Sequence, residues 1–358
     1  MNIREATASY EKWLGEGTKL VRGDLELKHE RMRESSFAFL RATFYRWMQV
    51  WPERCPEAAA APAVLAVGDL HIENFGTWRD VEGRLIWGIN DFDEAYPLPY
   101  TADLVRLATS ACLAVNSGDL AIHSREACDA ILEGYGDGLK SVGKPFVLAE
   151  GHAWLRVLAL GELRDPARFW EKMQGLPAWP GEVPAEARQV LEQQLPEREL
   201  KYLLKKRVAG VGSLGRQRVV ALADWRGAQV CREAKALLPS ACVWAKPEAA
   251  GQRIWYGEIM EHAVRVPDPF TRLTASWVVR RLAPDCSRIE LSAVPKHRDE
   301  AHLLRAMGAE TANVHLGSKD ALAAVQQDLK KRPGDWLHQA AKEMADAVTE
   351  DWEAWKRP

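Results

Sequence analysis

Three side chains, Asp69, Asn74 and Asp91, carry oxygen atoms in a pattern that suits metal-assisted chemistry. An amide oxygen and a carboxylate are hard ligands, and with phosphates and waters they hold Mg²⁺ in many proteins. A further acid beside such a pair suits a base or a hydroxyl-orienting group for phosphoryl transfer. The pattern therefore predicts Asn74 and Asp91 as metal ligands. Asp69, in the loop after the apolar segment 63–67, is predicted as the acid that acts on an acceptor.

A β-hairpin is needed to bring Asn74 and Asp91 together. Residues 75–79 and 84–90 predict its two strands, because both segments are rich in aromatic and β-branched residues and they flank a turn sequence. Antiparallel pairing across that turn places Asn74 opposite roughly Asn90. Asn74 and Asp91 are then expected side by side at the open end of the hairpin.

A second motif, Gly210–Gly215, has the pattern G-x-G-x-x-G. Glycines let backbone N–H groups approach phosphate oxygens that a Cβ would keep away. Residues 216–222 predict a strand and not the helix that a dinucleotide fold needs, and a glycine loop between strands is the protein-kinase arrangement. The alternative is a simple β-turn. The residues expected to contact phosphate are Gly210, Gly212, Ser213 and Gly215.

The rest of the chain predicts helical, β-rich and helical segments in that order. Residues 1–56 are expected to be helical, and a helix is expected from Asp103 with that acid as its N-cap. Five prolines between 151 and 196 indicate a connector, and helices return after residue 297. The β-rich part extends to about residue 294. The strands expected within it are 208–212, 216–225, 228–234, 254–261 and 276–283.

Three short blocks resemble the catalytic core of kinase-like phosphotransferases such as aminoglycoside phosphotransferases and choline kinases. They are Val-Gly-Asp-Leu-His-Ile-Glu-Asn at 67–74, Ile-Asn-Asp-Phe-Asp-Glu-Ala at 89–95 and Ala-Asp-Leu at 102–104. More closely, the whole chain resembles the bacterial domain-of-unknown-function family 2252, whose hallmark is GDxHxxNFG followed by NDFDE. The position before Gly-Asp is Val67, where many such kinases have a polar residue. This position takes no part in the reaction, so the departure weakens the resemblance only slightly.

The resemblance implies roles for further residues. Asp69 would be the catalytic-loop acid, Asn74 and Asp91 the ligands of Mg²⁺, and ATP the phosphoryl donor. Supporting roles fall to His71, Asp93 and Asp103. A kinase also places a lysine on its third strand, where the resembled family usually shows lysine and this chain has Arg232. Arginine is not equivalent to lysine, and Lys235 is a second candidate. The sequence alone does not decide whether Arg232 or Lys235 contacts the nucleotide.

The order of the motifs is reversed relative to ordinary kinases, because the catalytic block at 69–91 precedes the glycine loop. Either the loop is an unrelated turn or the chain is circularly permuted. We expect an α+β, protein-kinase-like two-lobe fold with the β-rich nucleotide lobe after the catalytic hairpin. The expected parts are a helical catalytic part (1–199), a β-rich nucleotide-binding part (200–295) and a helical return to the catalytic lobe (296–358).

Composition argues against several classes of partner. The 48 basic and 50 acidic residues give a net charge of −2, so neither nucleic acid nor an anionic membrane is an expected partner. The longest apolar run, 58–67, falls short of the ~20 residues that span a bilayer, and the N-terminus predicts no secretory signal. Six cysteines without C-x-x-C suit a reducing cytosol. A soluble cytoplasmic protein is expected.

The predicted function is ATP- and Mg²⁺-dependent phosphoryl transfer to a small-molecule or protein hydroxyl that the sequence does not identify. Two alternatives stay open. A nucleotide-binding pseudokinase would suit an arginine in place of the strand lysine. A kinase-like nucleotidyl (AMP) transferase would use the same ligands for a different phosphorus atom.

Overall fold

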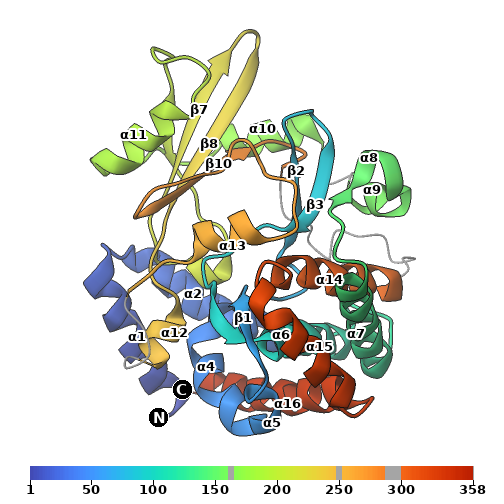
Figure 1. The fold of residues 1–358 in the computed structure, drawn as a ribbon. Helices are drawn as coiled ribbons and strands as arrows, with labels where there is room; N and C mark the ends of the chain where they lie inside the picture. Colours follow the sequence, from blue (N-terminus) through green and yellow to red (C-terminus); the bar gives the residue numbers. More distant parts are fainter. Residues whose placement is uncertain (160–164, 247–251, 287–299, 358) are drawn as a thin grey trace.

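The computed structural model describes residues 1–159, 165–246, 252–286 and 300–357. A helical body occupies one half of the molecule, and an antiparallel sheet with flanking helices occupies the other (Figure 1). The predicted α+β class is therefore confirmed. The expected division into 1–199, 200–295 and 296–358 stays a prediction.

Both ends of the chain build the helical body. Its N-terminal helices are α1 (Ile3–Gly17), α2 (Arg22–Glu34), α3 (Ser36–Ala42), α4 (Phe44–Arg54) and α5 (Pro56–Ala59), as predicted for 1–56. Its other helices are α6 (Tyr100–Asn116), α7 (Ser124–Lys140), α14 (Glu300–His315), α15 (Leu322–Lys331) and α16 (Trp336–Lys356). Nearly every residue of α6 is buried, which is the mark of a central helix. It packs against α16, and α7 packs against α14.

Two small sheets hold the predicted catalytic segments. Strand β1 (Ala63–Ala66) pairs with β4 (Tyr96–Pro99), while β2 (Phe75–Arg79), β3 (Leu85–Ile89) and β5 (Phe146–Val147) form the other sheet. Phe75 pairs with Ile89, and the Asn90 N–H donates to the Asn74 carbonyl over 3.2 Å. The predicted register of the hairpin is confirmed. Asn74 and Asp91 accordingly lie at its open end.

The larger sheet is entirely antiparallel, in the order β6-β7-β8-β10-β9. Its strands are β6 (Leu203–Lys206), β7 (Arg218–Trp225), β8 (Ala228–Ala236), β9 (Arg272–Leu273) and β10 (Trp277–Leu282). Alternating residues face opposite sides. Val219 packs toward α11 (Ala185–Gln193), and Val220 packs toward α10 (Pro166–Gln174). The sheet thus has apolar clusters of its own, apart from the main core.

Three predicted elements differ in the structure. The first strand of the large sheet is β6, not 208–212, and the glycine motif instead forms a 3₁₀ turn at Val211–Ser213. Residues 254–261, expected as a strand, contribute to helix α13 (Tyr256–His262), whose buried Tyr256 and Ile259 have the three-residue spacing of a helix face. Helix α6 begins at Tyr100, so Asp103 is not its N-cap.

The predicted strands 216–225, 228–234 and 276–283 are confirmed as β7, β8 and β10. The predicted end of the β-rich part, 287–294, lies outside the described residues, as does residue 297. The remaining short helices are α8 (Leu148–Gly151), α9 (Ala153–Ala159) and α12 (Ala241–Ala245).

Candidate active site

A cavity lies where the N-terminal helices, the catalytic segments and the glycine motif meet. The predicted site residues on its walls are Asp69, His71, Asn74, Asp91, Asp93, Gly210, Gly212 and Ser213. The glycine motif therefore faces Asp91 across one cavity, although nearly 120 residues of chain separate them. Gly215, Arg232 and Asp103 are not on its walls, and Lys235 reaches Asp91 from the large sheet.

Helix α6 fixes the loop that carries Asp69. The Asp103 carboxylate accepts hydrogen bonds from the backbone N–H groups of Val67 (2.7 Å) and Gly68 (2.8 Å), and from His315 Nε2 (2.9 Å). A carboxylate that accepts backbone N–H groups holds a segment firmly, because such charge-assisted bonds are stronger than neutral ones. Gly68 has a φ of 83°, and a Cβ there would lie 2.2 Å from the Glu94 carbonyl oxygen. Only glycine fits this close approach.

Asp69 itself is held by a buried arginine. Arg106 Nε donates to Asp69 Oδ1 over 2.9 Å, and its Nη2 donates to the same oxygen and to the Leu40 carbonyl (2.8 Å). Burial raises the pKa of Asp69, and the Arg106 charge opposes that rise. Arg106 takes up Oδ1, while Oδ2 lies beside Gly212, where an added Cβ would be 3.4 Å away. One carboxylate oxygen of Asp69 is thus directed toward the glycine motif.

Asn74 is oriented by the backbone of the other two predicted residues. Its Nδ2 donates to the carbonyl oxygens of Asp69 (3.4 Å) and Asp91 (3.2 Å). With the amide nitrogen used in this way, the Oδ1 acceptor lies on the opposite side of the group. Asn74 thereby ties the two acidic segments together while keeping a neutral oxygen for a ligand.

Asp91 and Asp93 share one ammonium group. Lys235 Nζ lies 3.1 Å from both Asp91 oxygens and 2.5 Å from Asp93 Oδ2. Burial lowers the pKa of Lys235, which the two carboxylates oppose; burial and the Asp91 charge raise the pKa of Asp93. Asp93 Oδ1 is buried and has no hydrogen-bond partner among the described residues. These are hard oxygen donors of the kind that divalent cations take.

The structure separates the two cationic candidates on β8. Lys235 and Arg232 have opposite parity along the strand, so they point to opposite faces. Arg232 Nε donates to the Gln194 carbonyl over 2.9 Å, and its guanidinium lies over the Phe270 ring, away from the cavity. Lys235 reaches the acidic pair. The structure does not bring Arg232 to the site.

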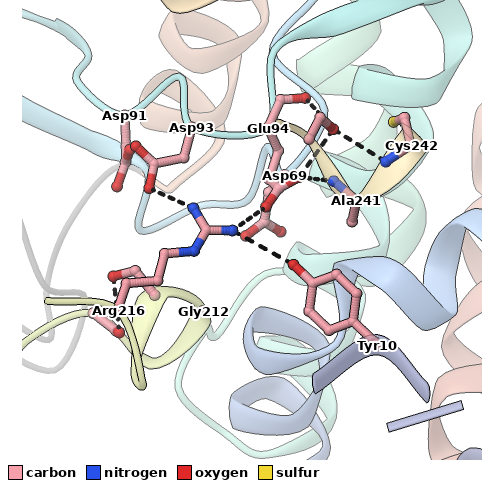
Figure 2. A network of polar contacts seen from close by, with 12 residues as sticks. Tyr10, Asp69, Asp91, Asp93, Glu94, Gly212, Arg216, Ala241 and Cys242 are labelled. Atoms are coloured by element: carbon pink, nitrogen blue, oxygen red, sulfur yellow. Dashed lines mark hydrogen bonds and ion pairs between the residues drawn. The ribbon is translucent and has the colours of Figure 1, made fainter. Parts of the chain in front are cut away.

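Arg216 links the glycine motif to the rest of the site (Figure 2). Its Nη2 donates to Glu94 Oε1 (3.1 Å) and to the Tyr10 hydroxyl (3.4 Å), and its Nη1 contacts Asp93 Oδ2 (3.4 Å). Glu94 Oε2 in turn accepts from the Ala241 N–H over 2.6 Å. Burial raises the pKa of Glu94. The network joins α1, the catalytic segment, the glycine motif and α12.

The glycine motif lies directly against the N-terminal helices. A Cβ on Gly212 would lie 2.9 Å from the Arg41 carbonyl oxygen, so a larger residue requires the loop to shift. Ser213 Oγ accepts from Arg218 Nη2 over 2.8 Å. The Gly215 carbonyl accepts from the Val21 N–H over 2.9 Å, so Gly215 anchors the loop to the start of α2 and does not line the cavity.

Several site residues have no counterpart in the sequence predictions. Arg106 could have been found, because an arginine within an apolar helical run indicates a buried ion pair. Glu94 belongs to the recognised Asn-Asp-Phe-Asp-Glu block but had no assigned role. Lys28 lies in a charged helical segment, whereas Arg41 is the one charged residue of α3, a largely apolar helix; neither was assigned a role from the sequence.

The molecule described so far is an α+β protein with a cavity, lined by acidic and basic side chains, between a helical body and a glycine-rich loop. The family model described as "Uncharacterized protein conserved in bacteria (DUF2252)" matches residues 20–164 and 179–358, so the chain belongs to that family. No curated protein and no solved structure matched the chain. In the part of the chain that the structure describes, no helix is both long and apolar enough to cross a bilayer.

Proposed function

We propose that this protein is an ATP- and Mg²⁺-dependent phosphotransferase with a kinase-like core in circularly permuted order. The observation that carries this proposal is the convergence of Asp69, Asn74 and Asp91 with the glycine motif on one cavity. The position of the glycine motif on the same cavity as the catalytic segment favours a phosphate-binding loop over an unrelated turn. In the proposed two-lobe arrangement, the large sheet is the nucleotide lobe and the helical body is the catalytic lobe.

The phosphoryl donor is assigned to the side of the cavity next to the large sheet. There Gly210–Gly212 line the cavity and would offer their backbone N–H groups to phosphate oxygens, whereas the Ser213 N–H already donates to the Gly210 carbonyl over 3.2 Å. Lys235 adds a cation from the third strand of the sheet. Asn74 Oδ1 and the carboxylates of Asp91 and Asp93 would hold Mg²⁺. The partnerless buried Asp93 Oδ1 supports this fit. Bound Mg²⁺ would neutralise charge on the phosphate oxygens.

The acceptor hydroxyl is assigned to Asp69. Arg106 holds Oδ1, so Oδ2 is the oxygen that orients the hydroxyl and takes its proton as the acceptor oxygen bonds to the γ-phosphorus. The bond between that phosphorus and the β–γ bridging oxygen breaks, and ADP leaves. The raised pKa of Asp69 brings this base nearer to neutral pH, which favours proton transfer.

The pseudokinase alternative loses its main support from the sequence. That alternative drew on Arg232 in place of a lysine, but Arg232 faces α11 and Lys235 contacts Asp91. Nucleotidyl transfer would use the same side chains, so the experiment below is designed to distinguish it from phosphoryl transfer.

The test follows the two labels of ATP. Full-length protein with Mg²⁺ is incubated with α- or γ-labelled ATP and a panel of sugars, amino alcohols, nucleosides and Ser/Thr peptides. Label transfer from the γ position alone supports the proposal, and transfer from the α position shows nucleotidyl transfer. Mg-ATP binding without transfer to any acceptor or to water identifies a pseudokinase. Absence of Mg-ATP binding by calorimetry overturns the proposal.

A further inference from the structure

A second buried lysine lies on the same cavity, and the phosphotransferase proposal gives it no role. Lys28 projects from α2 and is only 1% exposed. Its ammonium lies 3.5 Å from the Gly212 carbonyl oxygen and 5.9 and 5.6 Å from the ring centroids of Tyr10 and Tyr45. Within the described ranges it forms no ion pair with a carboxylate. Its positive charge is therefore not neutralised by a salt bridge.

Such an environment is unfavourable for a lysine in the absence of a ligand. Buried charges in proteins are normally paired, since removing an ion from water without a counter-ion is strongly unfavourable. One carbonyl and two aromatic faces replace only part of the lost hydration, and burial lowers the pKa of Lys28 to about 8. A methionine of similar size would pack here without that penalty. The lysine is thus better explained by something negative that enters the cavity.

A second cationic group on the cavity wall has an unused donor. Arg41, on α3, pairs with Glu73 through Nη1 (2.5 Å), but its Nε is buried without a hydrogen-bond partner among the residues described. Gly212 lies next to both residues, close to the Arg41 carbonyl and the Lys28 ammonium. Lys28 thus reaches the tip of the glycine loop through its ammonium, whereas Arg41 contacts the loop through its backbone; both residues line the cavity, and the Arg41 charge also acts on Asp69.

The two buried lysines have different acidic neighbours. The carboxylates whose charges act most on Lys28 are Glu11, Glu94 and Asp69, whereas for Lys235 they are Asp91 and Asp93. Lys235 thus belongs with the residues assigned to the metal and the donor. Lys28 lies at the tip of the glycine loop, where its ammonium is 3.5 Å from the Gly212 carbonyl oxygen and Asp69 Oδ2 lies beside the same glycine, so Lys28 is close to the residue assigned to the acceptor.

We propose that Lys28 and Arg41 bind an anionic group, a phosphate or a carboxylate, on the acceptor whose hydroxyl lies at Asp69. This inference rests on the proposed function and adds the class of substrate: a hydroxyl compound that already carries a negative charge. The ammonium is a compact point charge with three donors, and the Arg41 Nε adds a fourth at the same wall. An acceptor with such a group would neutralise the buried lysine as it binds.

Calorimetry on the full-length protein saturated with Mg²⁺ and the ATP analogue AMP-PNP tests this. Inorganic phosphate and acetate are the probes, one for each source of negative charge, and the saturated nucleotide site keeps them from binding there. The variants are Lys28→Met, Lys28→Gln and, as a matched control, Lys12→Met, which removes an exposed lysine of the neighbouring helix α1.

We expect at least one probe to bind the wild-type protein, with Kd raised about 10- to 100-fold in Lys28→Met and Lys28→Gln, the range for a charge-assisted hydrogen bond. Lys12→Met should match wild type, and AMP-PNP affinity should stay the same in all variants. Absence of probe binding to wild type, or wild-type Kd in both Lys28 variants, overturns the proposal.

A purely structural role for Lys28 gives a different signature. Without anion, Lys28→Met should melt at or above the wild-type temperature, because it removes an unpaired buried charge. If Lys28→Met melts several degrees lower, Lys28→Gln decides, since its amide can still donate to the Gly212 carbonyl. Wild-type anion affinity in Lys28→Gln would show that Lys28 only holds the glycine loop in place, and this would overturn the anion-binding proposal. If AMP-PNP itself does not bind, the proposed function fails, and the same titrations on nucleotide-free protein decide the anion site separately.

Discussion

Lys235 and Lys28 are both 1% exposed, yet the protein treats their charges differently. Lys235, from the large sheet, lies between two carboxylates. Lys28, from the N-terminal helices, meets a carbonyl and two aromatic rings. On the sheet side the protein supplies its own counter-charge, whereas on the helical side no carboxylate of the residues that the structure describes pairs with Lys28. The difference shows for which lysine the protein supplies its own counter-charge and for which one a bound ligand would have to supply it.

The local setting of each lysine explains the contrast. Lys235 shares a face of β8 with Glu233, whose carboxylate is bound by Arg207, Arg218 (2.7 Å) and Arg280 (3.8 Å). Because these arginines bind the Glu233 carboxylate, Lys235 pairs with Asp91 and Asp93 instead. Near Lys28, Glu11 pairs instead with His29 and Glu94 with Arg216, so both acids are engaged elsewhere.

The largest effect is expected from Asp91→Ala. This change removes a candidate metal ligand and one of the two acids that pair with Lys235, so Mg²⁺-dependent ATP binding should weaken by more than about 100-fold. Anion binding at Lys28 should persist, because the carboxylates whose charges act most on that lysine do not include Asp91. Calorimetry with Mg-ATP and with phosphate measures both. A folded Asp91→Ala protein with wild-type affinity for Mg-ATP would refute the metal assignment.

Asp69→Asn should lower turnover by about 10²-fold or more, the range for removing a general base. Mg-ATP affinity should barely change, because Asp69 is assigned to the acceptor. In the wild-type protein the deprotonated form is active, so the rate should rise with pH through the raised pKa of Asp69 and then level off. Steady-state kinetics across pH measures this. Parallel loss of ATP binding and turnover would contradict the assigned role.

The two lysine-to-methionine variants compare the surroundings of the lysines directly. Lys235→Met leaves Asp91 and Asp93 without their shared cation, so the free energy of unfolding should fall by about 2 kcal/mol, less than for a fully buried pair because Asp91 is 24% exposed. Lys28→Met should leave that free energy unchanged or raise it by about 1 kcal/mol. Urea denaturation at pH 7 measures both. Equal destabilisation by the two changes would contradict the proposed difference between the electrostatic surroundings of Lys235 and Lys28.

The smallest effect concerns the pH dependence of stability. The pKa of Lys28 is lowered by burial to about 8 from 10.5, so above pH 8 the unfolded chain binds a proton that the folded one has released. Stability of the ligand-free wild type should therefore rise relative to Lys28→Met, by about 1 kcal/mol between about pH 8 and pH 9. Urea midpoints at both pH values measure the difference. Curves that run parallel would show that Lys28 is not desolvated.

The sequence predicted best where residue types and a turn close in the chain determine the structure. The hairpin that brings Asn74 to Asp91 followed from two segments rich in aromatic and β-branched residues and the turn between them, and its register is as expected. Local rules failed where distant contacts decide. Asp103 looked like an N-cap because it precedes an apolar face, but its carboxylate binds the N–H groups of Val67 and Gly68. No pattern in the sequence near Asp103 indicates these hydrogen bonds to a loop more than 30 residues earlier.

The same limit explains the residues that were missed. Lys28 lies in a run of charged residues, and only the fold shows that Asp24 and Lys28 are the charged members that are buried. The rivalry between Arg232 and Lys235 could not be resolved from the sequence, because strand parity says that they face opposite sides but not which side holds the site. Packing of α11 against one face of the sheet resolves it.

Helix α16 has a consequence for how the protein is made. It covers α6, the helix that holds the Asp69 loop, and Arg46 of α4 is bound to Asp351 of α16 over 2.7 Å. The ribosome therefore releases the catalytic segment early but its covering helix late, after the whole sheet has emerged. Until then the apolar surface of α6 lacks its covering helix, so we expect the nascent chain to rely on chaperones. A product truncated before residue 336 should contain every proposed catalytic residue and yet form no active site.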